Sequence, residues 1–165
     1  MTVQGAIRDG SETLVLQGYL ESLAMIERLH RLLLDVIKDE FERLAVEEIN
    51  PVQALLLFNI AEHEVTAGEL KSRGYYQGSN VSYNLKKLVD MGYMHHQRSD
   101  VDRRSVRVKL TDKGRDLRVQ IADLFRRHAG LLAVKAGVSV AGLEDVNLYL
   151  RRLERFWGEQ IRYIY

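Results

Sequence analysis

The stretch "SDVDRRSVRVKLTDKG", residues 99–114, combines a charged turn, a strand and the start of a helix. Polar and apolar residues alternate over 105–110, which predicts a β-strand, and residues 93–98 provide a looser partner strand. Thr111 follows as a candidate helix cap. The stretch therefore predicts a β-hairpin that leads directly into a helix, with three charged residues at its tip: Asp102, Arg103 and Arg104.

The residues before this hairpin predict two short helices joined by a tight connection. Thr66 and Glu69 have the spacing of a capping box, which starts a helix that runs to about residue 72. A second helix runs from about Ser79 to residue 91 and ends at Gly92. This arrangement is a helix-turn-helix pattern, and the appended hairpin makes it a winged helix.

Helical periodicity also dominates the N-terminal part of the chain. We expect one long helix that begins at Ser11, its predicted N-cap, and continues to about Leu44. Asn50 and Pro51 then read as a cap and a first helical residue, followed by a buried helix over the apolar segment 52–64. Val65-Thr66 is expected to be a short extended piece.

After the hairpin, the chain returns to helix. The helix capped by Thr111 is broken at Gly137, and Ser139 restarts the chain in a last helix. The predicted fold is therefore mainly α with a small β-hairpin wing.

The first and last helices carry more apolar residues than a small winged domain can cover. In the last helix they recur at nearly heptad spacing: Leu143, Val146, Leu150, Leu153, Trp157 and Ile161. We expect residues 11–48 and 115–165 to form a helical dimerisation region, and residues 50–114 to form the winged helix-turn-helix region of a single compact chain. The alternative is a large monomeric helical core.

The composition limits the possible chemistry. The chain has no cysteine, which excludes disulfides, thiolate metal sites and cysteine nucleophiles. The N-terminal residues lack a signal-peptide pattern, and no apolar run approaches the ~18 residues of a membrane helix. We therefore expect a cytoplasmic protein that does not contact a membrane.

Charge is distributed unevenly along the chain. Residues 71–118 hold twelve basic and five acidic residues, whereas the remainder holds twelve basic and 18 acidic residues, so that the net charge is only +1. A basic middle segment is the electrostatic pattern of a protein that binds a polyanion. A solvated basic face is the alternative that charge by itself does not exclude.

The wing sequence resembles that of the MarR family of bacterial transcription regulators. The family's D-x-R motif is matched by Asp102 and Arg104, and its L-T-x-x-G junction by the stretch from Leu110 to Gly114. Residues 66–93 are similar to the family's DNA-reading unit, and the resemblance spans about residues 14–153. The connection at residues 73–78 is bulkier and more aromatic than in many members, and is similar to the LdtR subgroup.

This resemblance implies a homodimer that binds double-stranded DNA at a palindromic operator, most often as a ligand-responsive repressor. It assigns Arg104 to the minor groove, where a narrow A·T-rich tract concentrates negative potential, and Asp102 to orienting that arginine. Arg103 is then a phosphate contact or a second groove contact, and Arg107 faces outward with the tip arginines. The resemblance also implies a small-molecule effector cleft, for which His30 is a candidate lining residue.

The predicted recognition helix has a polar and basic face opposite its apolar one. Asparagine can pair with adenine through two hydrogen bonds, short hydroxyl groups can contact phosphates and base edges, and lysines suit phosphates. The candidate DNA-contacting residues on this helix are Ser79, Asn80, Ser82, Tyr83, Lys86 and Lys87.

No pattern indicates an enzyme, a metal site or a cofactor. The sequence has no phosphate loop, nucleophile elbow or helical zinc motif. His95 and His96 are neighbours in a predicted strand and therefore point to opposite faces. The competing hypothesis to a DNA-binding regulator is a winged-helix adaptor whose basic wing docks an acidic protein partner.

Overall fold

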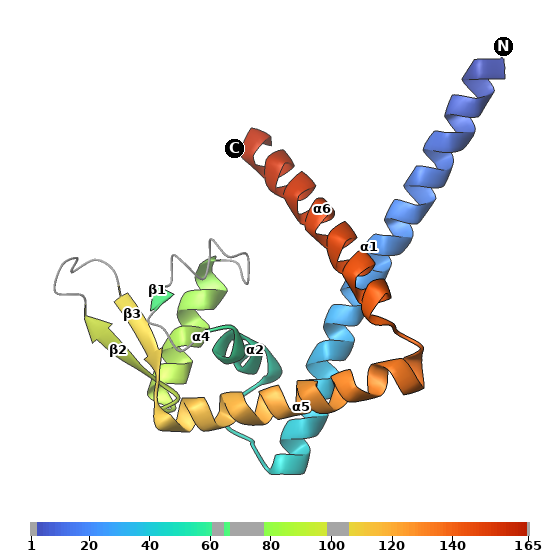
Figure 1. Cartoon of the computed structure of the whole chain (residues 1–165). Helices are drawn as coiled ribbons and strands as arrows, with labels where there is room; N and C mark the ends of the chain where they lie inside the picture. Colours follow the sequence, from blue (N-terminus) through green and yellow to red (C-terminus); the bar gives the residue numbers. More distant parts are fainter. Residues whose placement is uncertain (1–2, 61–64, 67–77, 99–105, 165) are drawn as a thin grey trace. The chain divides into compact units, whose positions relative to one another are not determined.

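The computed structural model describes residues 3–60, 65–66, 78–98 and 106–164 (Figure 1). The chain divides into two compact units, Met1–Ile121 and Ala122–Tyr165. The first unit contains α1 (Val3–Leu44), α2 (Pro51–Asn59), β1 (Val65–Thr66), α4 (Gly78–Asp90), β2 (Met94–Arg98) and β3 (Val106–Leu110). Helix α5 (Asp112–Ala136) begins in the first unit and ends in the second, which also holds α6 (Val140–Ile164).

These elements confirm the predicted fold, which is mainly α with a β-hairpin. Among the described residues, no helix is long and apolar enough to span a bilayer.

The predicted hairpin is confirmed: β2 and β3 pair antiparallel, from Met94 opposite Leu110 to Arg98 opposite Val106. Val108 and Leu110 are buried while Arg107 is exposed, as the alternation of β3 predicts. Strand β1 pairs with the other edge of β3, giving the order β1-β3-β2. The extended piece at 65–66 is thus confirmed, and its role as a third strand is new.

Helix α4 presents one apolar face to the core of the first unit. Val81 and Leu88 are fully buried and Leu85 nearly so, as the helical spacing of these residues predicts. The α4 helix also contacts β2 and α2, whose Leu56 and Leu57 are fully buried. This packing leaves the opposite face of α4 open to solvent.

Helix α2 starts as predicted but is shorter than predicted. The Asn50 side chain accepts the backbone N–H of Gln53 at 2.9 Å, and the Gln53 side chain accepts the backbone N–H of Asn50 at 3.1 Å, which completes a capping box before Pro51. The helix ends at Asn59, because the buried Ile60 takes an extended backbone conformation. The prediction of a helix to residue 64 is therefore wrong at Ile60, and residues 61–64 lie outside the described part.

Helix α1 begins earlier than predicted. It starts at Val3, so Ser11 lies inside the helix on an exposed position and is not its N-cap. An N-cap requires the preceding backbone to leave the helical conformation, and neither proline nor a competing turn interrupts residues 3–10.

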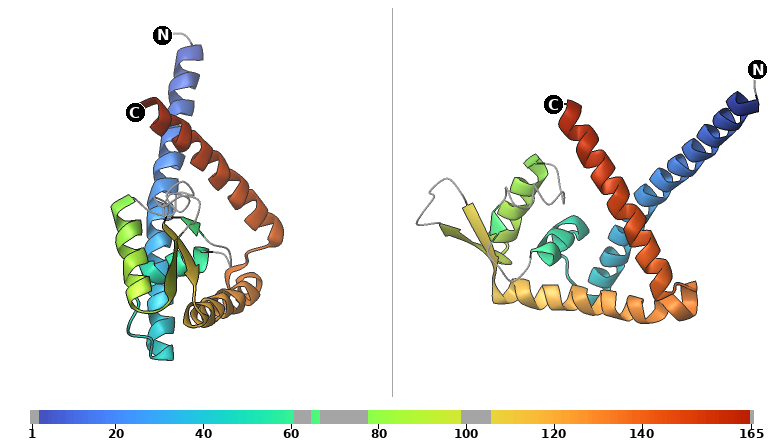
Figure 2. Two further views of the ribbon diagram at one scale, coloured as in Figure 1. Left: turned by 90° about the vertical axis from the view of Figure 1, so that its left-hand side faces the viewer. Right: turned by 45° about the horizontal axis from the view of Figure 1, so that its top comes forward.

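The end of the hairpin and the start of α5 share one set of hydrogen bonds. The Thr111 hydroxyl donates to the Gly92 carbonyl at 2.7 Å and accepts the Gly114 backbone N–H at 3.1 Å, which confirms Thr111 as the cap of α5. The Thr111 backbone N–H donates to the Tyr93 carbonyl at 3.1 Å. As a result, β3 passes into α5 with no intervening loop (Figure 2).

The predicted break between the last two helices is also confirmed. Gly137 has a φ of +64°, a left-handed conformation that glycine adopts without steric cost. The Ser139 hydroxyl then accepts the Gly142 backbone N–H at 3.0 Å and caps α6.

We predict that Gly114→Ala destabilises the protein by about 2 kcal/mol, because the new Cβ would overlap the Tyr93 carbonyl oxygen, a backbone atom that cannot rotate away. Gly130→Ala is the matched control: its Cβ would meet no atom within 4 Å in the same helix, so it should stabilise by about 0.5 kcal/mol. Chemical denaturation of both variants measures the difference. Equal stability of the two variants would contradict the close approach at Gly114.

Candidate nucleic-acid interface

The candidate recognition residues gather on the exposed face of α4. Asn80, Ser82, Lys86 and Lys87 are exposed, and Tyr83 keeps 60% of its surface open to solvent. Ser79 lies in the first turn of the same helix, and its side chain is outside the described part. The structure therefore places the predicted residues together on one helix, opposite the buried apolar face.

Two members of this set also contact each other. The Lys87 ammonium lies 5.8 Å from the centre of the Tyr83 ring, at the limit of a cation–π contact. The ring and the positive charge therefore form one surface, which can stack on a sugar or meet a phosphate.

The wing supplies one described candidate. Arg107 lies exposed on β3, paired with Gln97 of β2 on one side and Thr66 of β1 on the other. The predicted tip residues Asp102, Arg103 and Arg104 lie outside the described residues. Their roles stay predictions.

A polar cluster holds the base of this lobe together. The Lys113 Nζ donates to the Glu48 carboxylate at 2.6 Å and to the Met91 carbonyl at 3.1 Å, and lies 4.3 Å above the Tyr93 ring. The Tyr93 hydroxyl donates to the same carboxylate at 3.4 Å. The α1–α2 connection is thereby joined to the start of α5 and to the end of α4.

The cluster changes the acidity of its members in opposite directions. The hydrogen bond and charge of Lys113 lower the pKa of Glu48, and the hydrogen bond from Glu48 raises the pKa of Lys113. Burial raises the pKa of Tyr93, because the phenolate form would lose its hydration. Over the pH range in which both ions are present, the pair stabilises the folded chain.

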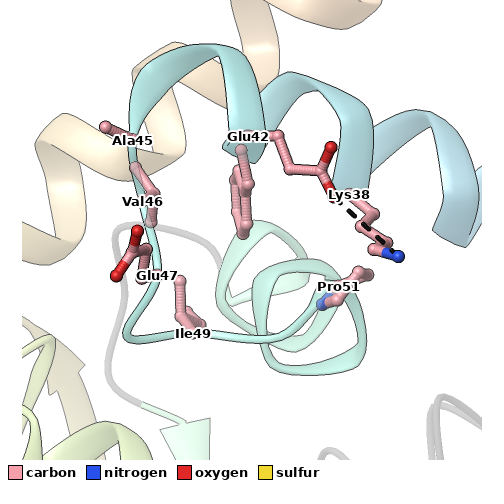
Figure 3. A pocket seen from close by; sticks show the side chains of 8 residues that line it. Lys38, Glu42, Ala45, Val46, Glu47, Ile49 and Pro51 are labelled. Atoms are coloured by element: carbon pink, nitrogen blue, oxygen red, sulfur yellow. Dashed lines mark ion pairs between the residues drawn. The ribbon is translucent and has the colours of Figure 1, made fainter.

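A hollow of about 440 Å³ lies at the connection between α1 and α2 (Figure 3). Its walls include the apolar residues Phe41, Val46, Ile49 and Pro51. An ion pair between Lys38 and Glu42, at 3.8 Å, lies at its edge.

The predicted ligand residue, His30, is exposed on α1 and does not line this hollow. The hollow was not predictable from the sequence, because only the chain reversal after residue 44 brings its walls together.

The sequence analysis also missed two buried polar residues. Gln53 of α2 and Asn84 of α4 are 6% and 9% exposed, and the Gln53 Nε2 donates to the Asn84 Oδ1 at 3.3 Å. A signal was present for each of them. Gln53 stands three residues after the cap Asn50, and Asn84 interrupts the apolar stripe between Val81 and Leu88.

Comparison with known proteins identifies this fold. Residues 49–114 match the family described as "Winged helix DNA-binding domain". The chain is 38% identical over 156 residues to the exopolysaccharide II synthesis transcriptional activator ExpG of Rhizobium meliloti (strain 1021), covering 94% of this chain and 79% of ExpG. The protein belongs to the MarR family of winged helix-turn-helix transcription regulators.

Solved structures of MarR proteins share the fold. A putative MarR family regulator from Listeria monocytogenes, complexed with a 26mer DNA, superposes with a TM-score of 0.73 at 19% identity, over 86% of this chain and 92% of that one. The Staphylococcus aureus MarR in complex with salicylate and kanamycin superposes with a TM-score of 0.68 at 19% identity, over 88% and 94% of the two chains.

MarR membership confirms the prediction of a DNA-binding transcription regulator that is not an enzyme. The closer resemblance to the LdtR subgroup stays a prediction. In this MarR protein, no group of three or more potential metal ligands is found among the described residues.

We predict that Glu48→Gln lowers the melting temperature at neutral pH and has little effect near pH 3. The folded-state pKa of Glu48 is lowered, so its stabilisation is present above the ordinary carboxyl range and is lost as the pH falls through the folded value. Thermal unfolding followed by circular dichroism measures the difference. Glu47→Gln changes the neighbouring exposed carboxylate and is the control, and a Glu48→Gln effect that is the same at both pH values contradicts the ion-pair assignment.

Proposed function

We propose that this MarR protein is a dimeric regulator that recognises a palindromic operator by placing α4 in the major groove and the wing in the adjacent minor groove. The observation that carries the proposal is the polar and basic face of α4, exposed opposite a fully buried apolar face. In helix-turn-helix proteins the second helix of the motif enters the major groove, and the sequence predicts that position for the helix observed as α4.

Different residues of the α4 face suit base edges and phosphates. Asn80 is exposed in the first turns of α4, where its amide can pair with adenine, and Ser79, Ser82 and Tyr83 flank it. Lys86 and Lys87 lie later in the helix and suit the phosphate backbone.

The wing supplies the minor-groove contact in this proposal. Arg104 enters the groove, Asp102 orients it, and Arg103 and Arg107 contact phosphates or the groove edge. Support comes from the D-x-R sequence and from Arg107, which is exposed on the return strand.

Dimerisation is supported by apolar side chains that remain exposed near both ends of the chain. On α1, Leu16 is 55% exposed and Leu20 is similarly open, while on α6 Val146 is 54% exposed and Leu150 is open as well. Apolar surface of this extent favours association, and two-fold symmetry would match a palindromic site. We assign this role to residues 11–48 and 115–165, with residues 50–114 binding DNA in the nucleoid of the cytoplasm.

Two observations support opposite directions of regulation. The MarR resemblance favours a ligand-responsive repressor, whereas the relative ExpG is named a transcriptional activator. Transcription in vitro from a promoter that carries the operator, with and without the protein, measures which of the two applies.

A small aromatic or amphipathic molecule is the proposed effector. The Staphylococcus aureus MarR was solved with salicylate, which has this chemistry. Two positions could receive it here: His30 on α1, and the hollow that Val46 and Ile49 line.

The DNA-binding proposal predicts distinct effects for two cations. Lys87→Ala should weaken binding to all duplexes and reduce the salt slope by roughly one, because one phosphate contact is lost. Arg104→Ala should weaken binding roughly tenfold to an operator with A·T-rich flanks, and less to one with G·C-rich flanks. Fluorescence anisotropy at several salt concentrations, with duplexes selected from a random pool by the wild-type protein, measures both effects.

Lys135→Ala, which removes a lysine from the last turn of α5, is the matched control and should leave the slope unchanged. If no duplex is enriched, the proposed recognition of a specific operator by α4 and the wing is wrong. Light scattering of the same samples should give twice the 19.0 kDa of the chain, and a particle of single-chain mass contradicts the dimer.

The effector proposal predicts that salicylate releases the selected duplex. Val46→Trp fills the hollow, so its insensitivity to salicylate would place the effector there, whereas insensitivity of His30→Ala would place it on α1. Anisotropy of the bound duplex measures release, and melting temperatures confirm that each variant is folded. No response of the wild-type protein contradicts an effector of this chemistry.

A further inference from the structure

Two amide side chains lie buried between α2 and the proposed recognition helix. Gln53 and Asn84 are 31 positions apart in the sequence, and the Gln53 Nε2 donates to the Asn84 Oδ1 at 3.3 Å. Around them the core is apolar, with Val81 and Leu88 of α4 fully buried. The amide pair is therefore a polar contact at a position where an apolar one would pack as well.

The hydrogen bonds continue from this pair in both directions. The Gln53 Oε1 accepts the backbone N–H of Asn50 at 3.1 Å, at the cap of α2. The Asn84 Nδ2 donates to the backbone carbonyl of Asn80 at 2.9 Å. A continuous chain of hydrogen bonds thus runs from the α1–α2 connection to the residue proposed to read a base edge.

Stability by itself does not explain the choice of amides. A buried hydrogen bond between neutral groups contributes about 1 kcal/mol net, and apolar side chains of the same volume contribute at least as much. What an apolar contact lacks is direction, because a hydrogen bond weakens steeply when its distance or angle changes. The amide pair therefore restricts how α4 can rotate about its own axis against α2.

Rotation of α4 matters because the DNA-facing side chains lie at the periphery of the helix. The helix with its side chains has a radius of about 5–6 Å, so a rotation of about 20° moves a peripheral atom by about 2 Å. Such a displacement is enough to break a hydrogen bond to a base edge. It matters less to a lysine, whose long flexible side chain can follow a phosphate.

We infer that Gln53 and Asn84 are positioning residues that set the rotation of α4 and thereby determine operator specificity. This inference rests on the proposed function, in which α4 reads the major groove. Gln53 belongs to α2, on the far side of the pair from the exposed reading face, so it acts on base recognition only through Asn84.

Gln53→Met tests the inference without altering any residue of α4. The variant removes the donor to Asn84, which leaves the buried Asn84 oxygen unpaired, and also removes the acceptor of the Asn50 N–H at the α2 cap, so both stability and specificity should fall. Specificity is the affinity for the duplex selected by the wild-type protein divided by the affinity for a scrambled duplex of the same composition. We expect this ratio to fall roughly tenfold, while the affinity for the scrambled duplex and its salt slope stay unchanged.

The double variant Gln53→Met/Asn84→Leu separates positioning from stability. Replacing both amides by apolar groups should recover the part of the melting temperature that the unpaired Asn84 oxygen costs, while the loss of the Gln53 acceptor for the Asn50 N–H remains and the specificity ratio stays low. Leu88→Val, which removes a buried methylene from the same face of α4, is the control and should lower stability with the ratio unchanged.

The outcomes distinguish failure of the proposed function from failure of the positioning role of Gln53 and Asn84. If the wild-type protein does not discriminate between the two duplexes, the proposed function fails. If it discriminates and the ratio recovers together with the melting temperature in the double variant, or never falls in Gln53→Met, the pair is merely structural and the inference is wrong. If the double variant does not fold, Gln53→Met is compared with Leu88→Val at matched stability. Equal specificity ratios of these two variants overturn the inference.

Discussion

The DNA-binding lobe depends on the hydrogen bonds that Thr111 makes between the end of the hairpin and the start of α5. Its hydroxyl group donates to the Gly92 carbonyl and accepts the Gly114 N–H, and its backbone N–H donates to the Tyr93 carbonyl. One residue therefore joins the end of α4, the start of β2, the end of β3 and the first turn of α5. Gly114 is required beside it, because the Tyr93 carbonyl occupies the space of a Cβ.

This junction explains why the surrounding polar residues are arranged as they are. Lys113, one residue before Gly114, reaches the Glu48 carboxylate and the Tyr93 ring, so the α1–α2 connection is held at the same place. The cluster is partly exposed, so solvent screens its charges and its value lies more in position than in stability. The position of the wing base, and hence the direction in which the wing leaves the lobe, follows from these contacts.

The interior and the surface of the lobe use polar groups for different purposes. The buried Gln53–Asn84 contact orients α4, whereas the exposed Asn80, Lys86 and Lys87 are available to DNA. Apolar groups also have two uses. Val81 and Leu88 stabilise the lobe, while Leu20 and Val146 remain open to solvent in the single chain and are available to a second copy.

The sequence by itself determined most of the described elements and the two faces of α4, because helical and strand periodicities are local properties of consecutive residues. The caps at Asn50, Thr111 and Ser139 were predictable for the same reason, since a cap bonds within three residues of itself. The prediction of Ser11 as a cap is wrong, because a serine in a helix interior has the same local sequence as one at its start. Tertiary structure alone decided the early end of α2 at Ile60, the pairing of β1 with β3 and the Gln53–Asn84 contact. Each of these joins residues far apart in the chain or depends on burial. The sequence can mark a residue, as it does Asn84 within an apolar stripe, but it does not say which distant residue that side chain contacts.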